Sequence, residues 1–309
     1  MFYGLDIGGT KIELAAFDQN FNLIEQVRKS TPLDDYPLFL DTISQMVIEF
    51  DKSLSCKGSV GIGFPGIQNY QDHTFVSVNI PCVIGKALDG DLSQLLDRKV
   101  LVANDCKCFA LSEAVLGSAK SYKNVFGAII GTGAGGGQVS EGQLHSGVRG
   151  FAGEWGHITA SAFLIDKHKL PLWPCACGLA GCAEQYVSGS GLQNIYKYLY
   201  QKKTSQALAK VTGQQIMSLV EKQDDTALHA FAIYLDMLAA SLATMHLSYD
   251  LDAIVLGGGM SNVKALYDKL PALVAQHLFD GVPVPAILAP ELGDSSGVRG
   301  AALLHKGQL

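Results

Sequence analysis

Short apolar runs that end at glycine or at polar residues recur along the chain and predict β-strands. The runs cover residues 2–7, 12–17, 23–29, 59–64, 100–103, 124–130, 137–139 and 253–256. A helix that opens at Thr31-Pro32 is predicted by the helical spacing of apolar residues at Phe39, Ile43, Met46, Val47 and Phe50. Further helices are expected over residues 108–116, within about 190–249, and over 297–305.

The order of these elements indicates two domains of similar construction. A strand followed by a glycine turn comes near the start of each half, at Gly8-Gly9 and again at Gly131-Thr132-Gly133. Such folds bind ligands outside the carboxyl ends of their strands. We therefore expect two related α/β domains with a cleft between them. The smaller would comprise residues 1–117 plus 295–309, and the larger residues 118–294.

Glycine is over-represented and clustered. The chain has 34 glycines in 309 residues, about 11%, whereas globular proteins average about 7%. The glycines lack the three-residue period of collagen and gather at residues 8–9, 131–137 and 257–259. Clustered glycine after an apolar run favours backbone that approaches a ligand closely.

Charge and hydropathy exclude several classes of protein. The formal net charge is −6 and there is no basic block, which argues against a nucleic-acid partner. No unbroken apolar run reaches the roughly 18 residues of a membrane span, and the N-terminal residues lack the pattern of a secretory signal. We expect a cytoplasmic protein, in which the seven cysteines do not form disulfides.

Two glycine segments nearly match known phosphate-binding motifs. Residues 4–11 approach a P-loop, but the order is Gly-Thr-Lys and the segment leads into a strand instead of a helix. Residues 131–136 have the spacing of a dinucleotide-binding turn, but the chain continues extended. Any one loop alone is compatible with a plain hairpin turn. Together they predict two loops that grip a polyphosphate, with Asp6 holding Mg²⁺ directly or through water.

Three cysteines within eight residues predict a metal site. Cys175, Cys177 and Cys182 are interleaved with glycine, and His157 upstream is a possible fourth ligand. Three thiolates and one imidazole form the closed tetrahedral set of structural zinc, which would fix its loop and take no direct part in catalysis. The alternative is that the three cysteines pack as small apolar residues. Cys106 and Cys108 have no such neighbours and are interpreted as packing residues.

Residues 6–11, 131–133 and 257–259 resemble the actin-like ATPase-domain sugar kinases, and among them the ROK family (repressors, open reading frames, kinases). Further likeness lies in residues 3–11, 56–63, 104–105, 108–114 and 175–189, so the resemblance covers the whole chain. It implies an α/β fold of two actin-like ATPase (ribonuclease H-like) domains with an interdomain cleft. It also implies a kinase that uses ATP to phosphorylate an amino sugar, N-acetylglucosamine, at O6.

The resemblance also assigns site residues. An Asp before a helix is by itself most often an N-cap, but in this family the residue matching Asp105 removes the proton from the attacking sugar hydroxyl. The implied sugar contacts are Gly66, Asn79, Asn104, Asp105, Glu154, His157 and Glu184. The implied ATP contacts are Gly4, Leu5, Asp6, Ile7, Gly8, Gly9, Thr10, Lys11, Thr132, Gly133, Ala134, Gly135, Gly136, Gly137, Gln138, Gly257, Gly258 and Gly259. Cys106 and Lys107 depart from the small or Asn residues that many relatives carry there.

Alternatives remain open within the family. Glucose and N-acetylmannosamine are other possible acceptors, because the choice between sugars depends on a few pocket contacts. A sugar-sensing regulator is disfavoured, because the helix-turn-helix that precedes the ATPase-like domain in such proteins has no room before residue 5. The resemblance further implies a homodimer, Mg²⁺ bound with the nucleotide, and zinc held by His157, Cys175, Cys177 and Cys182.

Overall fold

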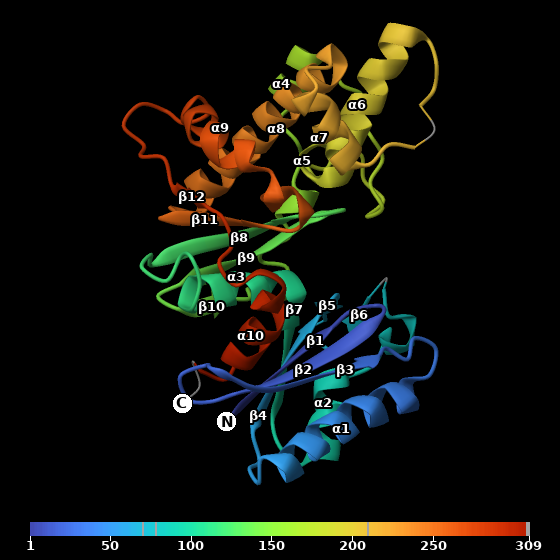
Figure 1. Ribbon diagram of the computed structural model, residues 1–309, viewed down its shortest axis with the longest axis vertical. Coiled ribbons are helices and arrows are strands. Elements are labelled where there is room, and N and C mark those ends of the chain that lie inside the picture. Colours follow the sequence, from blue (N-terminus) through green and yellow to red (C-terminus); the bar gives the residue numbers. More distant parts are fainter. Residues whose placement is uncertain (70, 78, 209, 307–309) are drawn as a thin grey trace. The chain divides into compact units, whose positions relative to one another are not determined.

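Figure 1 shows the computed structural model of the chain, which describes residues 1–306 except residues 70, 78 and 209. The chain forms two compact units. Unit 1 comprises Met1–Lys123, Gly137–Gly153 and Glu291–Leu309, and unit 2 comprises Asn124–Gly136 and Glu154–Pro290. The predicted boundary after residue 117 differs from this division, and residues 137–153, predicted in the larger domain, fold with unit 1. Residues 307–309 of the predicted C-terminal segment lie outside the described residues.

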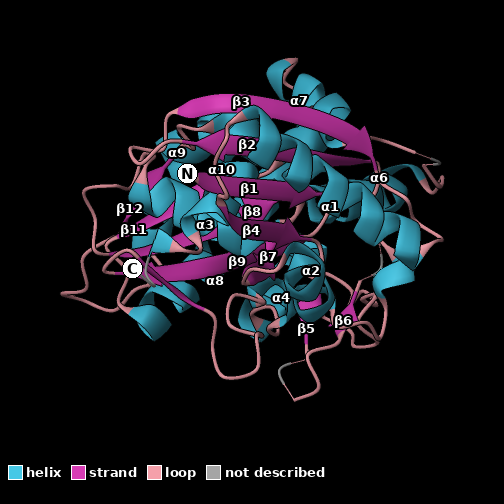
Figure 2. Ribbon diagram, turned by 90° about the horizontal axis from the view of Figure 1, so that it is seen from below, coloured by secondary structure: helices cyan, strands magenta, loops and turns pink. Residues whose placement is uncertain are grey.

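A five-stranded sheet forms the centre of unit 1. Its strands are β1 (Phe2–Ile7), β2 (Lys11–Phe17), β3 (Leu23–Ser30), β4 (Ser59–Phe64) and β7 (Val100–Asn104). They follow the order β3-β2-β1-β4-β7, in which β1, β4 and β7 are parallel (Figure 2). The carboxyl ends of these three strands therefore meet at one edge, where Asp6 pairs with Gly63 and Gly63 with Ala103.

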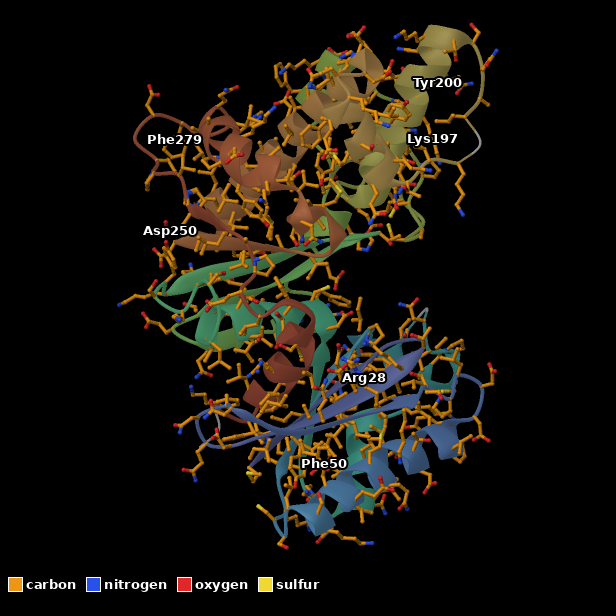
Figure 3. The ribbon with its side chains drawn as sticks, in the orientation of Figure 1. Arg28, Phe50, Lys197, Tyr200, Asp250 and Phe279 are labelled. Carbon is orange, nitrogen blue, oxygen red and sulfur yellow. The ribbon has the colours of Figure 1, made fainter. Side chains whose placement is uncertain are left out.

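Helices pack against this sheet. They are α1 (Tyr36–Ser53), α2 (Leu88–Leu96), α3 (Asp105–Val115) and α10 (Ser296–Leu303), accompanied by the short hairpin β5 (Ile67–Gln68) and β6 (Phe75–Val76) and the 3₁₀ turns η1 (Pro81–Val83) and η4 (Gly293–Ser295). On α1 the ring of Phe50, labelled in Figure 3, meets Tyr3 of β1 edge-on. The ring centroids are 5.9 Å apart. Helix α1 begins five residues later than Thr31, because Asp35 accepts the Leu38 amide at 2.9 Å as its N-cap.

Helix α10 lies directly on the backbone of the sheet. A Cβ atom at Gly4 would come 1.9 Å from the carbonyl oxygen of Val298, and one at Gly61 would come 1.9 Å from that of Ala301. A larger residue at either position would push the helix away, because protein interiors are close-packed. The packing of α10 thus explains Gly4 without a nucleotide contact.

A fully buried carboxylate, Glu113 of α3, holds the chain on either side of unit 2. Its Oε2 accepts the amides of Ser118 at 3.1 Å and Glu291 at 3.0 Å. Its Oε1 accepts the Leu292 amide at 3.0 Å and the Ser296 hydroxyl at 2.9 Å. One side chain thereby fastens the segment that leads toward unit 2 and the segment that returns from it.

The second five-stranded sheet has the order β10-β9-β8-β11-β12. Its strands are β8 (Asn124–Ile130), β9 (Ala134–Ser140), β10 (Gln143–His145), β11 (Ala253–Gly257) and β12 (Ala286–Leu288). The chain passes from unit 2 to unit 1 within β9, between Gly136 and Gly137. Strand β9 begins at Ala134, so the predicted glycine loop of residues 131–137 is correct only for its first three residues. In β9 the glycines allow close approach to the neighbouring strand β8. A Cβ at Gly136 would come 2.5 Å from the carbonyl oxygen of Gly127 on β8.

The helices of unit 2 surround α8 (Asp225–Tyr249). They are α4 (Ala162–His168), α5 (Glu184–Val187), α6 (Gly189–Thr204), α7 (Gly213–Glu221) and α9 (Lys264–Ala275), with the 3₁₀ turns η2 (Trp155–His157) and η3 (Gly259–Asn262). By length and composition α8 is apolar enough to cross a membrane, but 67% of its most apolar window is buried inside the protein. Helix α8 is therefore read as the core helix of unit 2.

Candidate active site and metal centre

The turn from β7 into α3 presents the carboxylate of Asp105. Asn104 is the N-cap of α3, and its Oδ1 accepts the Cys106 amide at 2.9 Å. Asp105 is consequently the first residue of the helix and not its cap. Its Oδ1 accepts the same amide at 2.9 Å. Burial raises the pKa of Asp105, which makes its carboxylate a stronger base.

Asp6 lies at the same sheet edge of unit 1. Burial, followed by the charges of Asp105 and Glu13, raises the pKa of Asp6 to about 6. Glu13 is occupied by Arg28 (Figure 3), whose Nε lies 2.6 Å from Glu13 Oε2. Asp6 and Asp105 are therefore the carboxylates available at this edge for a cation, and oxygen ligands suit Mg²⁺.

Asn79 and the glycine turn between β1 and β2 lie side by side. The Gly8 amide donates to the carbonyl of Lys11 at 2.9 Å, and the Thr31 hydroxyl donates to the carbonyl of Gly8 at 2.7 Å. A Cβ at Gly9 would come 3.2 Å from the carbonyl oxygen of Asn79. A predicted sugar residue is thus adjacent to a predicted phosphate turn.

Gly66 and Asn104, two predicted sugar contacts, touch directly. Asn104 Nδ2 donates to the carbonyl of Gly66 at 3.3 Å. Asn104 Oδ1 accepts the hydrogen bond that caps α3, so both the oxygen and the nitrogen of its side-chain amide are hydrogen-bonded. The clearest role of Asn104 in this structure is therefore to fix the turn that carries Asp105.

In unit 2, Glu184 braces the second glycine turn. The Gly131 amide donates to the carbonyl of Gly133 at 3.0 Å, and the Gly131 carbonyl accepts the Gly189 amide at 2.7 Å. Glu184 Oε2 accepts the Ala134 amide at 2.9 Å. The predicted phosphate turn is therefore held by the starts of α5 and α6.

A pocket of about 1080 Å³ opens beside this turn, entirely within unit 2. Ligand pockets commonly measure about 300–1,000 Å³, so it accommodates a nucleoside. Thr132 and Gly259, both predicted ATP contacts, line it. Sequence reasoning missed the other polar lining residues, which include Gln193, Thr212, Gln214, Asn262 and Lys264. Asn262 ends the turn η3 that follows the glycine cluster of β11, and the others stand on or beside α6, α7 and α9, where no local signal marks them.

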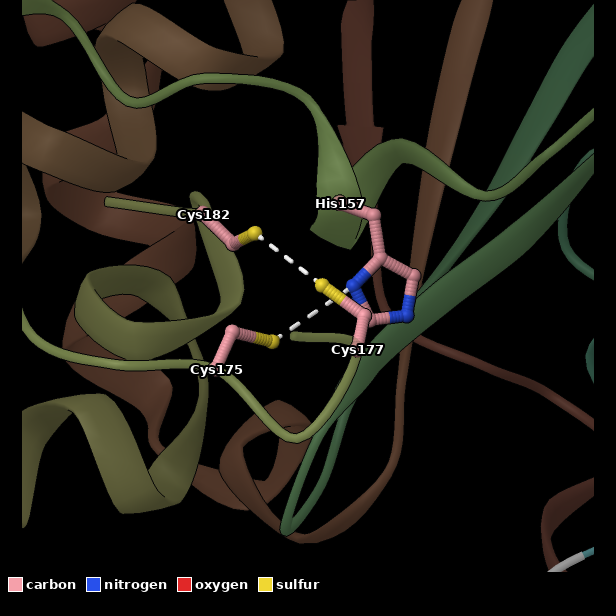
Figure 4. Close-up of side chains that lie close together, drawn as sticks. All are labelled: His157, Cys175, Cys177 and Cys182. Atoms are coloured by element: carbon pink, nitrogen blue, oxygen red, sulfur yellow. Dashed lines mark hydrogen bonds between the residues drawn. The ribbon is translucent and has the colours of Figure 1, made fainter. Parts of the chain in front are cut away.

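Figure 4 shows that the predicted metal ligands converge in unit 2. The Sγ atoms of Cys177 and Cys182 lie 3.6 Å apart, and Cys175 Sγ lies 3.7 Å from His157 Nδ1. Zinc–sulfur bonds of about 2.3 Å in a tetrahedron give sulfur–sulfur edges of about 3.7 Å. Burial and the neighbouring thiols raise the pKa of Cys182, so a cation is needed for the thiolates to form together. The donor set fits zinc.

The loop that carries the cysteines is a tight knuckle. The Cys175 amide donates to the carbonyl of Leu179 at 2.7 Å, and the Gly178 amide donates back to the carbonyl of Cys175 at 3.0 Å. Gly178 and Gly181 have φ angles of +92° and +76°, which explains the glycines between the ligands. Cys177 is exposed, which does not fit the alternative of three buried apolar cysteines.

Glu154 and His157 flank the turn η2. Trp155 Nε1 donates to the carbonyl of Gly135 at 2.7 Å and fastens this turn to β9. His157 Nδ1 faces the thiols, so the metal role predicted for His157 accounts for that nitrogen. Glu184 Oε1 lies 3.8 Å from Cys175 Sγ, so Glu184 joins the ligand cluster to the glycine turn.

The predicted residues divide between the two units. Unit 1 contains Gly66, Asn79, Asn104, Asp105, residues 4–11, Gly137 and Gln138, and unit 2 contains Glu154, His157, Glu184, the three cysteines, residues 132–136 and residues 257–259. The side chains of Leu5 and Ile7 are buried in the core, so only their backbone is available to a ligand. Cys108 is also fully buried, as expected of a packing residue.

Similarity to known proteins covers the whole chain. The ROK family matches residues 2–308. The N-acetylgalactosamine kinase AgaK of Shewanella sp. (strain ANA-3) is 45% identical over 309 residues, covering 99% of this chain and 97% of that protein. An N-acetyl-D-glucosamine kinase of Yersinia enterocolitica is 39% identical over 307 residues, covering 99% of each chain.

Solved structures agree. A ROK hexokinase from Thermus thermophilus has a TM-score of 0.86 at 26% identity, covering 99% of this chain and 98% of that one. A ROK family glucokinase from Streptomyces griseus, solved with glucose and AMPPNP, has a TM-score of 0.73 at 26% identity, covering 99% of each. The α/β fold expected from the resemblance is confirmed.

Proposed function

Because the chain belongs to the ROK family, we propose that it transfers the γ-phosphoryl group of ATP to O6 of an N-acetylhexosamine, with N-acetylglucosamine as the first candidate. The observation that carries the proposal is the carboxylate of Asp105. Asn104 takes over the capping of α3, and burial raises the pKa of Asp105. A buried carboxylate at the end of a parallel strand is suited to removing a proton from a bound hydroxyl.

In the proposed reaction Asp105 accepts the proton of the sugar 6-hydroxyl while that oxygen attacks the γ-phosphorus. The new oxygen–phosphorus bond forms as the bond to the bridging oxygen of ADP breaks. Mg²⁺ bound with the nucleotide supplies neutralisation of the phosphate charge. Asp6 is the residue of this chain placed to hold that ion, and the turns at Gly8-Gly9 and Gly131–Gly133 offer backbone amides to phosphate oxygens.

The unit 2 pocket is the proposed nucleoside site. Two of the predicted ATP contacts, Thr132 and Gly259, line it, and its volume of about 1080 Å³ is ample for adenosine, which supports this proposal. We assign Glu154, His157 and Glu184 to the sugar on the strength of the family resemblance. Asn79, beside Gly9, is assigned in the same way.

N-acetylgalactosamine is a second candidate acceptor. The 45%-identical relative from Shewanella bears the name of a kinase for that sugar. The two sugars differ only in the configuration at C4, and one hydroxyl contact can decide between them. Glucose and N-acetylmannosamine complete the set of acceptors to be compared.

We also propose that His157, Cys175, Cys177 and Cys182 hold one structural Zn²⁺. Their distances fit a tetrahedral ion, and four protein ligands leave it no open position. The ion would stabilise the loop that carries His157 and the start of α5 with Glu184. A cytoplasmic location and a homodimer remain predictions from the sequence.

The test is a coupled assay of ADP release with the four sugars, followed by ³¹P NMR of the product. We expect the highest kcat/KM with an N-acetylhexosamine and a phosphomonoester at C6. Preference for glucose would contradict the substrate class. The absence of ATP-dependent phosphorylation with every sugar would contradict the kinase assignment itself.

A further inference from the structure

Lys107 is a buried lysine two residues after Asp105. It is only 3% exposed. Its Nζ donates to the carbonyl of Gly150 at 2.7 Å and approaches that of Ser146 at 3.4 Å. Lysine is rarely buried unless its ammonium is satisfied, so these carbonyls form part of a specific site for it.

The stem of the same side chain lies against β9. A Cβ at Gly137 would come 2.9 Å from Lys107 Cα and 3.3 Å from its Cγ. Gly137 belongs to the glycine strand that follows the proposed phosphate turn. Lys107 therefore contacts two segments of unit 1: the glycine strand β9 and the loop of residues 146–150.

Lys107 also lines a cavity together with two proposed sugar contacts, Gly66 and Asn104. Lys107, Gly150, Gly66 and Asn104 line one cavity of about 20 Å³. A polar cavity of this size has room for a single water. The loop of residues 146–150 is thereby joined, through Lys107, to the turn that carries Asp105.

The tip of the loop is exposed. Val148 at its tip is 92% exposed, so no apolar side chain there anchors it to the core. Three residues beyond Gly150 the chain leaves unit 1, and the next residue is Glu154. The position of the loop fixes the point from which the chain continues to this proposed sugar contact.

We propose that Lys107 is a positioning residue for the acceptor sugar. Its ammonium holds the carbonyls of residues 146 and 150 and thereby sets the path of the chain toward Glu154. The proposal rests on the proposed function. It follows that loss of the ammonium weakens sugar use far more than ATP use.

The test compares Lys107→Met with Lys57→Met. The first variant keeps an apolar stem of similar length and removes the ammonium. The control removes an exposed ammonium that also donates to a backbone carbonyl, that of Asp97 at 3.0 Å. For Lys107→Met we expect KM for the sugar to rise tenfold or more, KM for ATP to change less than twofold, and amide hydrogen exchange of residues 146–153 to accelerate. The control leaves all three unchanged.

A second variant, Lys107→Gln, keeps N–H donors on a shorter side chain and serves if the Met variant does not fold. Its sugar KM is expected to rise less than that of Lys107→Met. An unchanged sugar KM in a folded variant overturns the proposal, as does an equal rise of both KM values, which indicates a general structural role. Failure of the kinase assignment can be distinguished from failure of this proposal. In that case the unaltered protein phosphorylates no sugar, but amide hydrogen exchange of residues 146–153 still shows whether Lys107 holds the loop.

Discussion

The two units hold their proposed site residues by different means. In unit 1, Asp6 and Asp105 stand at the ends of paired strands and at the start of a helix capped by Asn104. In unit 2, helix α4 and a cysteine knuckle connect His157 to the start of α5, and three thiols and one imidazole converge there. Strand pairing and a helix cap hold the first arrangement, whereas the second adds the proposed metal to the backbone hydrogen bonds of the knuckle.

This difference determines what each region is sensitive to. Carboxylates on packed elements keep their positions when a side chain is changed, but their charge depends on pH and on neighbouring buried groups. Ligands on a loop are also held by backbone hydrogen bonds, such as that from the Cys175 amide to the carbonyl of Leu179, but loss of a shared ion removes the link between His157 and the thiols. Changes to a carboxylate in unit 1 and to a thiol in unit 2 should therefore have different consequences.

Asp105→Asn tests the unit 1 base. The amide cannot accept the proton, so kcat is expected to fall by about 10³-fold, within the range of about 10²–10⁴ for general bases. Sugar binding, measured by calorimetry, stays within threefold. The matched control is Asp72→Asn, an exposed aspartate of unit 1, with unchanged kcat. More than a tenth of the normal kcat in Asp105→Asn would exclude Asp105 as the base.

Glu113→Gln tests how strongly buried hydrogen bonds order unit 1. Three amides and two hydroxyls donate to Glu113, so an amide at this position places its own N–H groups against donors. We expect the free energy of unfolding to fall by about 2–4 kcal/mol, measured by urea denaturation. Glu49→Gln, at an exposed position of α1, should change it by less than about 0.5 kcal/mol. Equal effects would mean that the Glu113 bonds carry no special weight.

Cys182→Ser tests the metal dependence of unit 2. One metal equivalent per chain is expected to disappear on elemental analysis, with activity reduced about 10- to 100-fold. Cys82→Ser, outside the cluster, keeps both metal and activity. Chelation of the unaltered protein should cause the same loss of metal and activity as Cys182→Ser. Cys82→Ser should respond to chelation as the unaltered protein does. Full activity in a metal-free sample would remove the proposed role of the ion.

The pH profile gives the smallest effect and concerns unit 1. Because the pKa of Asp6 is about 6, the carboxyl is half protonated there, and activity is expected to fall several-fold between pH 7 and pH 5. More Mg²⁺ should shift this fall to lower pH.

The stability of the protein is expected to change with pH in the opposite direction. The folded state binds the Asp6 proton more tightly than the unfolded state, so the Asp6 contribution to the free energy of unfolding grows as pH falls through 6 toward 4. Asp6→Asn should abolish the stability trend, and its persistence would assign the trend to another group.

Parts of the fold and of the candidate site could be predicted from the sequence where a residue type and its spacing are characteristic of one structure. Strands β1, β4 and β8 have the predicted bounds, because each is a buried run that ends at a turn residue. The ligand cluster follows from the spacing of Cys175, Cys177 and Cys182, since few arrangements other than a knuckle bring them together.

The rest depends on partners that are distant in sequence. Helix α3 begins three residues earlier than predicted, because its first turn contains Asp105 and Lys107 and shows no apolar spacing. Residues 107–114 are all buried, so the helix has no polar face to reveal its orientation. Lys107 and Glu113 are explained only by the carbonyls and amides that reach them from residues 146–150 and 291–292.

The placement of α10 on the backbone of β1 and β4 has a consequence for biosynthesis. The last strand of that sheet ends at Asn104, and α10 begins at Ser296, roughly 190 residues later. At about 5–20 residues per second, the ribosome needs on the order of 10–40 s to make the intervening chain. During that time the face of β1 and β4 at Gly4 and Gly61, on which α10 packs, is not covered by α10. The first sheet therefore cannot complete its packing until α10, its own last helix, has been synthesised.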